Sequence, residues 1–70
     1  MFSLKDYFNA LSGRARTQFA KRAGVPLPTI QRHYIYRTRI PRLDRMRAMA
    51  DAAGVPATEM AEFFLQPRNN

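Results

Sequence analysis

The chain contains no cysteine, and with only 70 residues this absence limits how it can fold. A domain of this size buries only about 60% of the surface that its unfolded chain exposes, so its core is small. The chain has no cysteine and only one histidine, His33. Disulfides, thiolate zinc sites and a Cys/His nucleophile pair are therefore excluded. Apolar packing must therefore hold one small domain together, with little room for an enclosed active site. We expect no enzymatic activity, no metal site and no cofactor.

The sequence has no apolar stretch approaching the ~20 residues of a membrane-spanning helix and no segment typical of a cleavable signal. Freedom from cysteine is compatible with a reducing compartment. We expect a soluble, cytoplasmic protein without a membrane partner.

Positive charge is concentrated in the middle of the chain. The formal net charge is +7, and no Asp or Glu occurs between Arg14 and Arg42, whereas the interval holds eight cations: Arg14, Arg16, Lys21, Arg22, Arg32, Arg37, Arg39 and Arg42. The five acids are Asp6, Asp44, Asp51, Glu59 and Glu62. A band of this kind attracts polyanions and makes their binding salt-dependent, so it favours a nucleic-acid partner over a merely solvated face.

Apolar periodicity and helix-capping residues predict an all-α domain of five helices, without linkers or repeats. Ser3 and Ser12 are suitable N-caps for the first two helices, and Gly24 and Gly54 are suitable stops for the second and fourth. The third helix is expected to begin near Leu27 and to continue to about residue 36, and the fourth to cover residues 41–53. We expect residues 1–66 to form the domain and residues 67–70 to form a flexible tail.

The spacing of Ala20, Gly24, Val25 and Ile30 is typical of a helix-turn-helix. Gly24 can adopt a left-handed conformation that ends one helix, and Ala20 is small enough for the next helix to cross closely. Val25 and Ile30 would then anchor the pair to the core.

Two longer stretches extend this pattern: "RTQFAKRAGVPLPTIQRH" and "IPRLDRMRAMADAAGVPATEM". From about Leu4 to Leu65 the chain resembles the lambda-repressor and Cro type of helix-turn-helix domain, and in particular small Cro-like regulators and antitoxins of prophages. The resemblance implies a compact five-helix lambda-repressor-like fold whose third helix enters the DNA major groove. It also implies a bacterial, nucleoid-associated location. Relatives often have a glycine after this helix, where this chain has Tyr36-Arg37-Thr38 and one residue more.

The resemblance places the base-contacting positions at Leu27, Pro28, Gln31 and Arg32. Arg32 can donate to both O6 and N7 of guanine, and Leu27 can contact a thymine methyl group. Gln31 can pair with adenine or with a phosphate, and a phosphate contact is the alternative for Arg32 as well. Contacts to the sugar-phosphate backbone would come from eight residues, which fix the position on DNA without specifying sequence: Arg16, Thr17, Gln18, Thr29, Tyr36, Arg37, Thr38 and Arg39.

Several residues have two interpretations. Thr29 could cap its helix instead of binding phosphate, and His33 is expected at the core edge or on a phosphate. Of Tyr34 and Tyr36, one is expected in the core and the other at a phosphate, the alternative being base stacking on single-stranded RNA. Phe63 and Leu65 are candidates for a dimer interface, with core packing as the alternative for Phe63.

The sequence thus predicts a sequence-specific regulator of transcription, a Cro-like repressor that binds a palindromic double-stranded DNA operator as a homodimer. The alternative is an antitoxin-like protein-interaction module in which DNA binding is secondary. A module of that kind would have a toxin as its partner.

Overall fold

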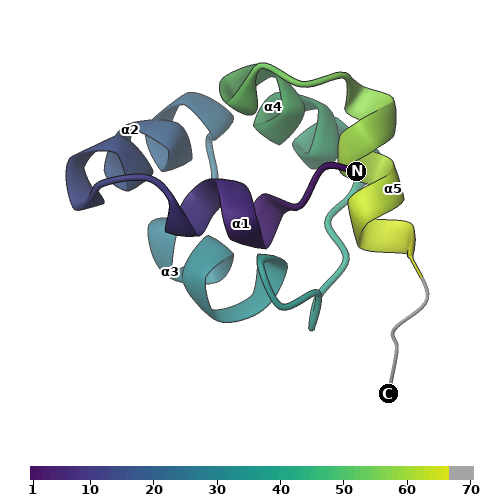
Figure 1. Ribbon diagram of the computed structural model, residues 1–70, viewed down its shortest axis with the longest axis horizontal. Coiled ribbons are helices and arrows are strands. Elements are labelled where there is room, and N and C mark those ends of the chain that lie inside the picture. The colour runs from purple at the N-terminus through teal and green to yellow at the C-terminus, as the bar shows by residue number, and fades with distance from the viewer. Residues whose placement is uncertain (67–70) are drawn as a thin grey trace.

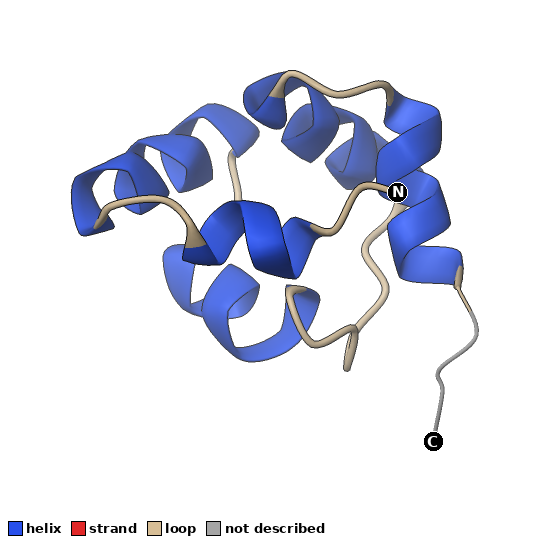
Figure 2. Ribbon diagram, viewed as in Figure 1, coloured by secondary structure: helices blue, strands red, loops and turns tan. Residues whose placement is uncertain are grey.

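The computed structural model describes residues 1–66 as a series of helices joined by short turns and by one longer connection, residues 35–42. The helices are α1 (Leu4–Asn9), α2 (Gly13–Ala23), α3 (Leu27–Thr29), η1 (Ile30–Tyr34), α4 (Leu43–Ala53) and α5 (Ala57–Leu65). Because α3 runs directly into η1, these segments make five helices, and no strand occurs within residues 1–66 (Figure 2). The all-α, five-helix prediction is confirmed for this part of the chain. Residues 67–70, expected to be a flexible tail, lie outside it.

Helix α1 begins as its sequence predicts. Ser3 Oγ accepts a hydrogen bond from the Asp6 backbone N–H at 3.2 Å, which satisfies one of the unpaired donors of the first turn. The Phe2 ring packs on Tyr7, with 6.1 Å between ring centroids, in the manner of a hydrophobic staple. Leu4 and Phe8 are the buried residues of this helix.

Helix α2 ends in a Schellman motif at Gly24. The glycine has φ 69°, its N–H donates to the Lys21 carbonyl oxygen at 3.2 Å, and the Val25 N–H donates to that of Ala20 at 3.1 Å. The same pair of bonds ends α4 at Gly54, where φ is 74°. Both glycine stops are thus confirmed. Helix α4 begins at Leu43, two residues later than predicted, because Arg42 has an extended backbone with ψ 162°.

A wide turn occupies the second half of the third helix. The Ile35 N–H donates to the carbonyl oxygen of Ile30 at 3.2 Å, a bond across five residues that is characteristic of a π-turn. The helix therefore ends at Tyr34, shorter than the predicted range to residue 36. The extra residue of the turn brings Tyr34 and Ile35, which are consecutive, both into the core at 5% exposure.

The connection from this helix to α4, residues 35–42, is the longest in the described chain (Figure 2). It starts with the same pair of hydrogen bonds as the glycine stops, from the Arg37 N–H to Tyr34 O and from the Thr38 N–H to His33 O. The left-handed position is held by Arg37, with φ 58°, where L side chains are disfavoured. Arg37 lies within the segment Tyr36-Arg37-Thr38, which follows the third helix.

The core lies between α4 and its neighbours. Helix α4 packs against both α2 and α5. In Figure 1, α1 lies in the middle of the view, with α2 and α3 on one side of it and α5 on the other. Six large side chains have almost no exposed surface: Phe8, Phe19, Leu4, Ile30, Met49 and Met60. The radius of gyration, 11.0 Å, equals the value of roughly 11 Å expected for a compact chain of this length.

The structure contradicts one sequence-based expectation, the absence of a repeat. Helix α4 starts and ends at positions 43 and 53, thirty residues after α2 at positions 13 and 23, and α5 starts at position 57, thirty after α3 at position 27. Identical residues recur at this offset around both corners: Ala20 and Ala50, Ala23 and Ala53, Gly24 and Gly54, Val25 and Val55, Pro26 and Pro56. We call residues 13–34 the first helix pair and residues 43–64 the second helix pair.

Candidate nucleic-acid interface

The outer surface of the α3–η1 helix carries most of the predicted base-contacting residues. Pro28, Gln31 and Arg32 are exposed, because Ile30 and Tyr34 turn the opposite side of the helix into the core. Leu27 is partly buried against the core and, with Lys21 and Gly24, lines a shallow hollow at the corner. The structure thus brings an arginine, an amide and a small apolar surface together on one short helix.

Exposed cations of α2 extend this surface. Arg14, Lys21 and Arg22 are exposed, as are Thr17 and Gln18, two of the predicted backbone contacts. The Thr17 hydroxyl donates to the Gly13 carbonyl oxygen at 3.1 Å, which leaves its oxygen lone pairs accessible to solvent. Phosphate binding by Lys21 and Arg22 was not predicted individually, although both belong to the basic band of the sequence.

Arg16 has a structural role that sequence analysis did not predict. Its Nε donates to the Phe8 carbonyl oxygen at 3.1 Å, and its Nη2 to that of Asn9 at 3.0 Å. The guanidinium also lies 5.2 Å from the centroid of the Phe8 ring. These carbonyls end α1, so the side chain caps that helix. We therefore withdraw Arg16 from the set of phosphate-contacting candidates.

Arg37 is likewise engaged within the chain. Its Nη1 donates to the Phe63 carbonyl oxygen at 3.4 Å, and its guanidinium lies 5.3 Å from the centroid of the Phe63 ring. The side chain therefore connects the end of the α3–η1 helix to α5, and we withdraw it from the phosphate-contacting candidates too. Its neighbour Arg39 is exposed and remains a candidate.

Local hydrogen bonds account for two further polar residues. The Thr38 hydroxyl donates to the His33 carbonyl oxygen at 3.3 Å and lies 3.1 Å from His33 Nδ1. These contacts connect the Thr38 side chain to both the backbone and the ring of His33. Thr29 is half-buried and does not cap its helix with its side chain, so the capping interpretation is wrong.

The two tyrosines have different environments. Tyr34 is buried, with its ring 5.8 Å from Phe64 in an edge-on arrangement, so it is the tyrosine that completes the core. Tyr36 is 52% exposed, and Lys5 Nζ lies 5.4 Å from the centroid of its ring. Tyr36 thus presents an aromatic surface beside a cation at the end of the α3–η1 helix.

Phe63 does not lie on the surface as a dimer contact would require. It is 5% exposed and packs between the rings of Phe2, 6.4 Å away, and Phe64, 5.1 Å away. Core packing, the alternative, is what the structure shows. Leu65 is 68% exposed and lines a groove on the outer side of α5 with Thr58, Ala61, Glu62 and Gln66.

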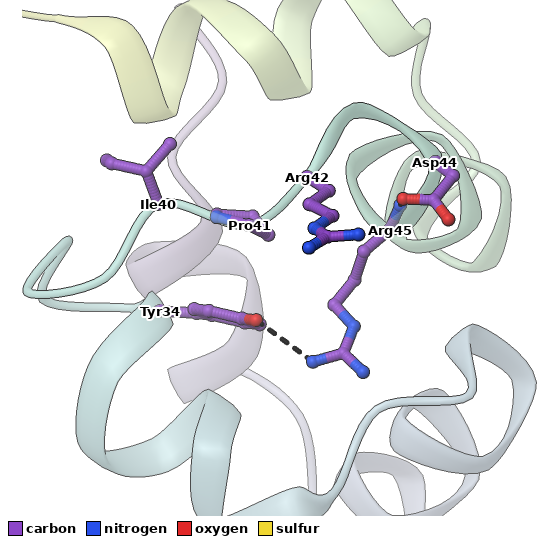
Figure 3. A pocket seen from close by; sticks show the side chains of 6 residues that line it. All are labelled: Tyr34, Ile40, Pro41, Arg42, Asp44 and Arg45. Carbon is purple, nitrogen blue, oxygen red and sulfur yellow. Dashed lines mark hydrogen bonds between the residues drawn. The ribbon is translucent and has the colours of Figure 1, made fainter.

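A cleft of about 460 Å³ between the α3–η1 helix and the start of α4 was missed by sequence analysis (Figure 3). Its lining residues are Tyr34, Ile40, Pro41, Arg42, Asp44 and Arg45. Arg45 reaches across it, and its Nη1 donates to the Tyr34 hydroxyl oxygen at 3.1 Å. Arg45 lies in the first turn of α4, which begins at Leu43. The apolar periodicity of the sequence placed this start at residue 41, so it did not predict the orientation of Arg45.

Neither a metal-binding cluster of His, Cys, Asp or Glu nor a helix long and apolar enough to cross a membrane occurs within residues 1–66. Comparisons with protein-family models, with curated proteins and with solved structures found no match to this chain. The case for a function therefore depends on the geometry and charge of the residues described above.

Proposed function

We propose that this protein binds double-stranded DNA through the first helix pair, in the manner of a helix-turn-helix, and represses transcription by occupying an operator. The observation that carries the proposal is the contrast in charge between two corners of the same shape. The first helix pair contains five cations and no acid, namely Arg14, Arg16, Lys21, Arg22 and Arg32. The second pair contains Arg45 and Arg47 with four acids, namely Asp44, Asp51, Glu59 and Glu62.

The α3–η1 helix would fit into the major groove of DNA. An α-helix with its side chains has a diameter of about 10–12 Å, and the major groove is about 12 Å wide. Arg32 would donate to guanine and Gln31 to adenine, while Leu27 and Pro28 would supply apolar contact to thymine methyl groups.

Backbone contacts would come from the exposed polar residues on both sides of that helix. Lys21 and Arg22 lie at the end of α2, and Arg39 lies in the connection that follows the α3–η1 helix. Thr17, Gln18, Thr29, Tyr36 and Thr38 remain neutral candidates for the same role. Such contacts hold the protein in register without specifying sequence.

A single helix of this length covers few base pairs, so we propose that two copies bind an inverted repeat with half-sites about one helical turn apart. Repression requires only that the bound dimer exclude polymerase from a promoter. A groove with an exposed leucine, Leu65, favours a second candidate function, binding of another protein to α5 as an antitoxin does.

Selection of bound duplexes from a random DNA pool tests the proposal directly. We expect an enriched site with inverted symmetry and an affinity that falls steeply as salt is raised. Arg32→Ala should cost about 1 to 3 kcal/mol on the selected site and little on scrambled DNA. Arg47→Ala, an equal loss of charge on the outer side of α4, is the matched control and should affect both duplexes little.

Three results would contradict this proposal. They are an unenriched pool, a flat salt response, and equal losses for Arg32→Ala on selected and scrambled duplexes. Weak, sequence-independent DNA binding combined with a protein ligand on α5 would favour the antitoxin-like function instead. Preference for single-stranded RNA would favour stacking on Tyr36.

A further inference from the structure

We propose that the cleft between the α3–η1 helix and α4 is a binding site for a phosphate oxyanion, held by Arg42, Arg45 and Tyr34. The site is defined by its own donors and does not depend on DNA recognition by the outer face of the α3–η1 helix. Its lining residues come from three segments of the chain, namely the end of η1, the connection of residues 35–42, and the first turn of α4.

The positive charge of Arg45 has no carboxylate partner at its guanidinium within residues 1–66. The residue is half-buried, and the hydrogen-bond partner of its guanidinium is a neutral phenol, the hydroxyl of Tyr34 at 3.1 Å. A neutral partner fixes the position of the guanidinium without compensating its charge. Only one of its five N–H donors is used in this bond, so others remain available to an acceptor in the cleft.

The hydroxyl hydrogen of Tyr34 is available to an acceptor in the cleft. Because the hydroxyl oxygen accepts from Arg45 Nη1, its own hydrogen must point toward a different acceptor. The ring is buried, with 5% exposure, and is held edge-on by Phe64, so the hydroxyl has a fixed position at the wall of the cleft. Within residues 1–66 no acceptor is bonded to this hydrogen, and an oxyanion in the cleft would supply one.

The hydrogen-bond donors of Arg42, Arg45 and Tyr34 line the same cleft. Figure 3 shows the side chains of Arg42 and Arg45 beside the Tyr34 hydroxyl, with the Arg42 guanidinium above the level of that hydroxyl and the Arg45 guanidinium below it. Three donors from separate directions suit a tetrahedral oxyanion better than a planar carboxylate, and arginine is a preferred phosphate ligand. A cleft of about 460 Å³ also has ample room for a phosphate group.

One carboxylate opposes this preference. Asp44 lines the cleft, and its Oδ1 accepts from the Arg45 backbone N–H at 2.9 Å. In Figure 3 the carboxylate lies at the α4 end, away from the Tyr34 hydroxyl. Two arginines against one aspartate leave the lining positive, so a phosphate at the Tyr34 end remains favoured.

Titration of inorganic phosphate into the ¹⁵N-labelled protein, at ionic strength held constant with sodium chloride, tests the site. We expect saturable shifts of the Arg45 side-chain Nε–H and of the backbone amides of residues 42–45. Arg42→Gln and Arg45→Gln should each lower the phosphate affinity about tenfold, since each removes a charge-assisted hydrogen bond. Tyr34→Phe, which keeps the ring and removes the hydroxyl, should lower it by a smaller factor of about three to five.

Arg47→Gln is the matched control, because Arg47 is exposed on the same helix and does not line the cleft. Arg42 is exposed as well, so its variant should keep the fold even if Arg45→Gln does not. Linear shifts without saturation, equal shifts in Arg42→Gln and Arg47→Gln, or shifts confined to Arg32 and Arg39 would overturn the site.

A second arm identifies the source of the phosphate group. If a duplex shifts the same resonances and displaces inorganic phosphate, the occupant is a phosphodiester of the DNA backbone. If the cleft still binds inorganic phosphate on the duplex-bound protein, the occupant is a free phosphate. Both results support the site. Failure to bind any duplex would contradict the proposed function, whereas the phosphate titration would still test the cleft.

Discussion

The two helix pairs of this domain have the same turn and opposite charge, although the π-turn of the first pair has no counterpart in α5. Each consists of an eleven-residue helix, a left-handed glycine, valine and proline, and a helix that crosses the first. The backbone angles of the two turns agree closely, with φ 69° and ψ 30° at Gly24 against φ 74° and ψ 30° at Gly54. The shape of a corner is therefore set by its glycine, valine and proline, irrespective of what surrounds it.

The outward-facing residues give the two corners different charges. At the thirty-residue offset, exposed Arg32 of the first pair corresponds to exposed Glu62 of the second, and Lys21 corresponds to Asp51. Their core positions are equivalent, because Ile30 and Met60 both have 0% exposure. Helix-turn-helix spacing alone thus cannot indicate DNA binding in this chain, and the charge of the outward positions must decide.

The largest expected effect concerns the shared core positions. Ile30→Ala and Met60→Ala should each lower the free energy of unfolding by about 2 to 5 kcal/mol, because each leaves a cavity in a fully buried site. Chemical denaturation measures both losses. A large loss at one position and almost none at the other would show that the two corners are not equivalent in packing.

Charge exchange between corresponding positions should separate the corners in function. Arg32→Glu should weaken operator binding by about 3 kcal/mol or more, since a lost base contact is combined with repulsion by phosphate. Glu62→Arg should leave operator binding nearly unchanged. Affinities measured at two salt concentrations would test this, and comparable effects of the two substitutions would contradict the assignment of DNA binding to the first pair.

The glycines should respond equally to substitution. Apart from the adjacent residues of the chain, no heavy atom lies within 4 Å of a Cβ added at Gly24 or Gly54, so the positive φ is what disfavours alanine. Gly24→Ala and Gly54→Ala should each destabilise the protein by about 1 to 2 kcal/mol. Thermal unfolding of both variants provides the measurement. Unequal losses would point to contacts beyond the backbone conformation.

The smallest expected effect distinguishes the starts of α2 and α4. Ser12 Oγ accepts from the Ala15 N–H at 3.2 Å, whereas Arg42, the corresponding residue of the second pair, makes no such side-chain cap. Ser12→Ala should therefore cost about 1 kcal/mol of stability, and Arg42→Ala almost none. Equal changes in the two unfolding midpoints would argue against this difference in capping.

The features that sequence analysis predicted correctly depend on neighbouring residues. Ser3 and Ser12 cap helices within three residues of themselves, and Gly24 and Gly54 end the helices that directly precede them. Such interactions require no knowledge of the tertiary fold, so residue type and spacing are sufficient to predict them.

The features that it missed depend on partners brought together by folding. Arg16 caps a different helix, and the guanidinium of Arg37 bonds to Phe63, 26 residues away. Both residues belong to the basic band, and composition cannot distinguish an arginine committed to carbonyl oxygens from one free to bind phosphate. The π-turn was missed for a similar reason, because burial of both Tyr34 and Ile35 favours it only once the core exists.

The attachment of α1 through Arg16 has a consequence for partial unfolding. A helix of six residues is far too short to persist alone in water, so α1 depends on the burial of Leu4 and Phe8 and on the carbonyl bonds of Arg16. We expect α1 to detach as a unit before global unfolding, which would give its amides faster hydrogen exchange than those of α4. The ring of Phe19 packs against Tyr7 and Phe8 of α1. Detachment would therefore expose this ring and create an apolar surface to which other molecules can bind. We therefore expect the loss of α1 from the domain to promote aggregation through this surface.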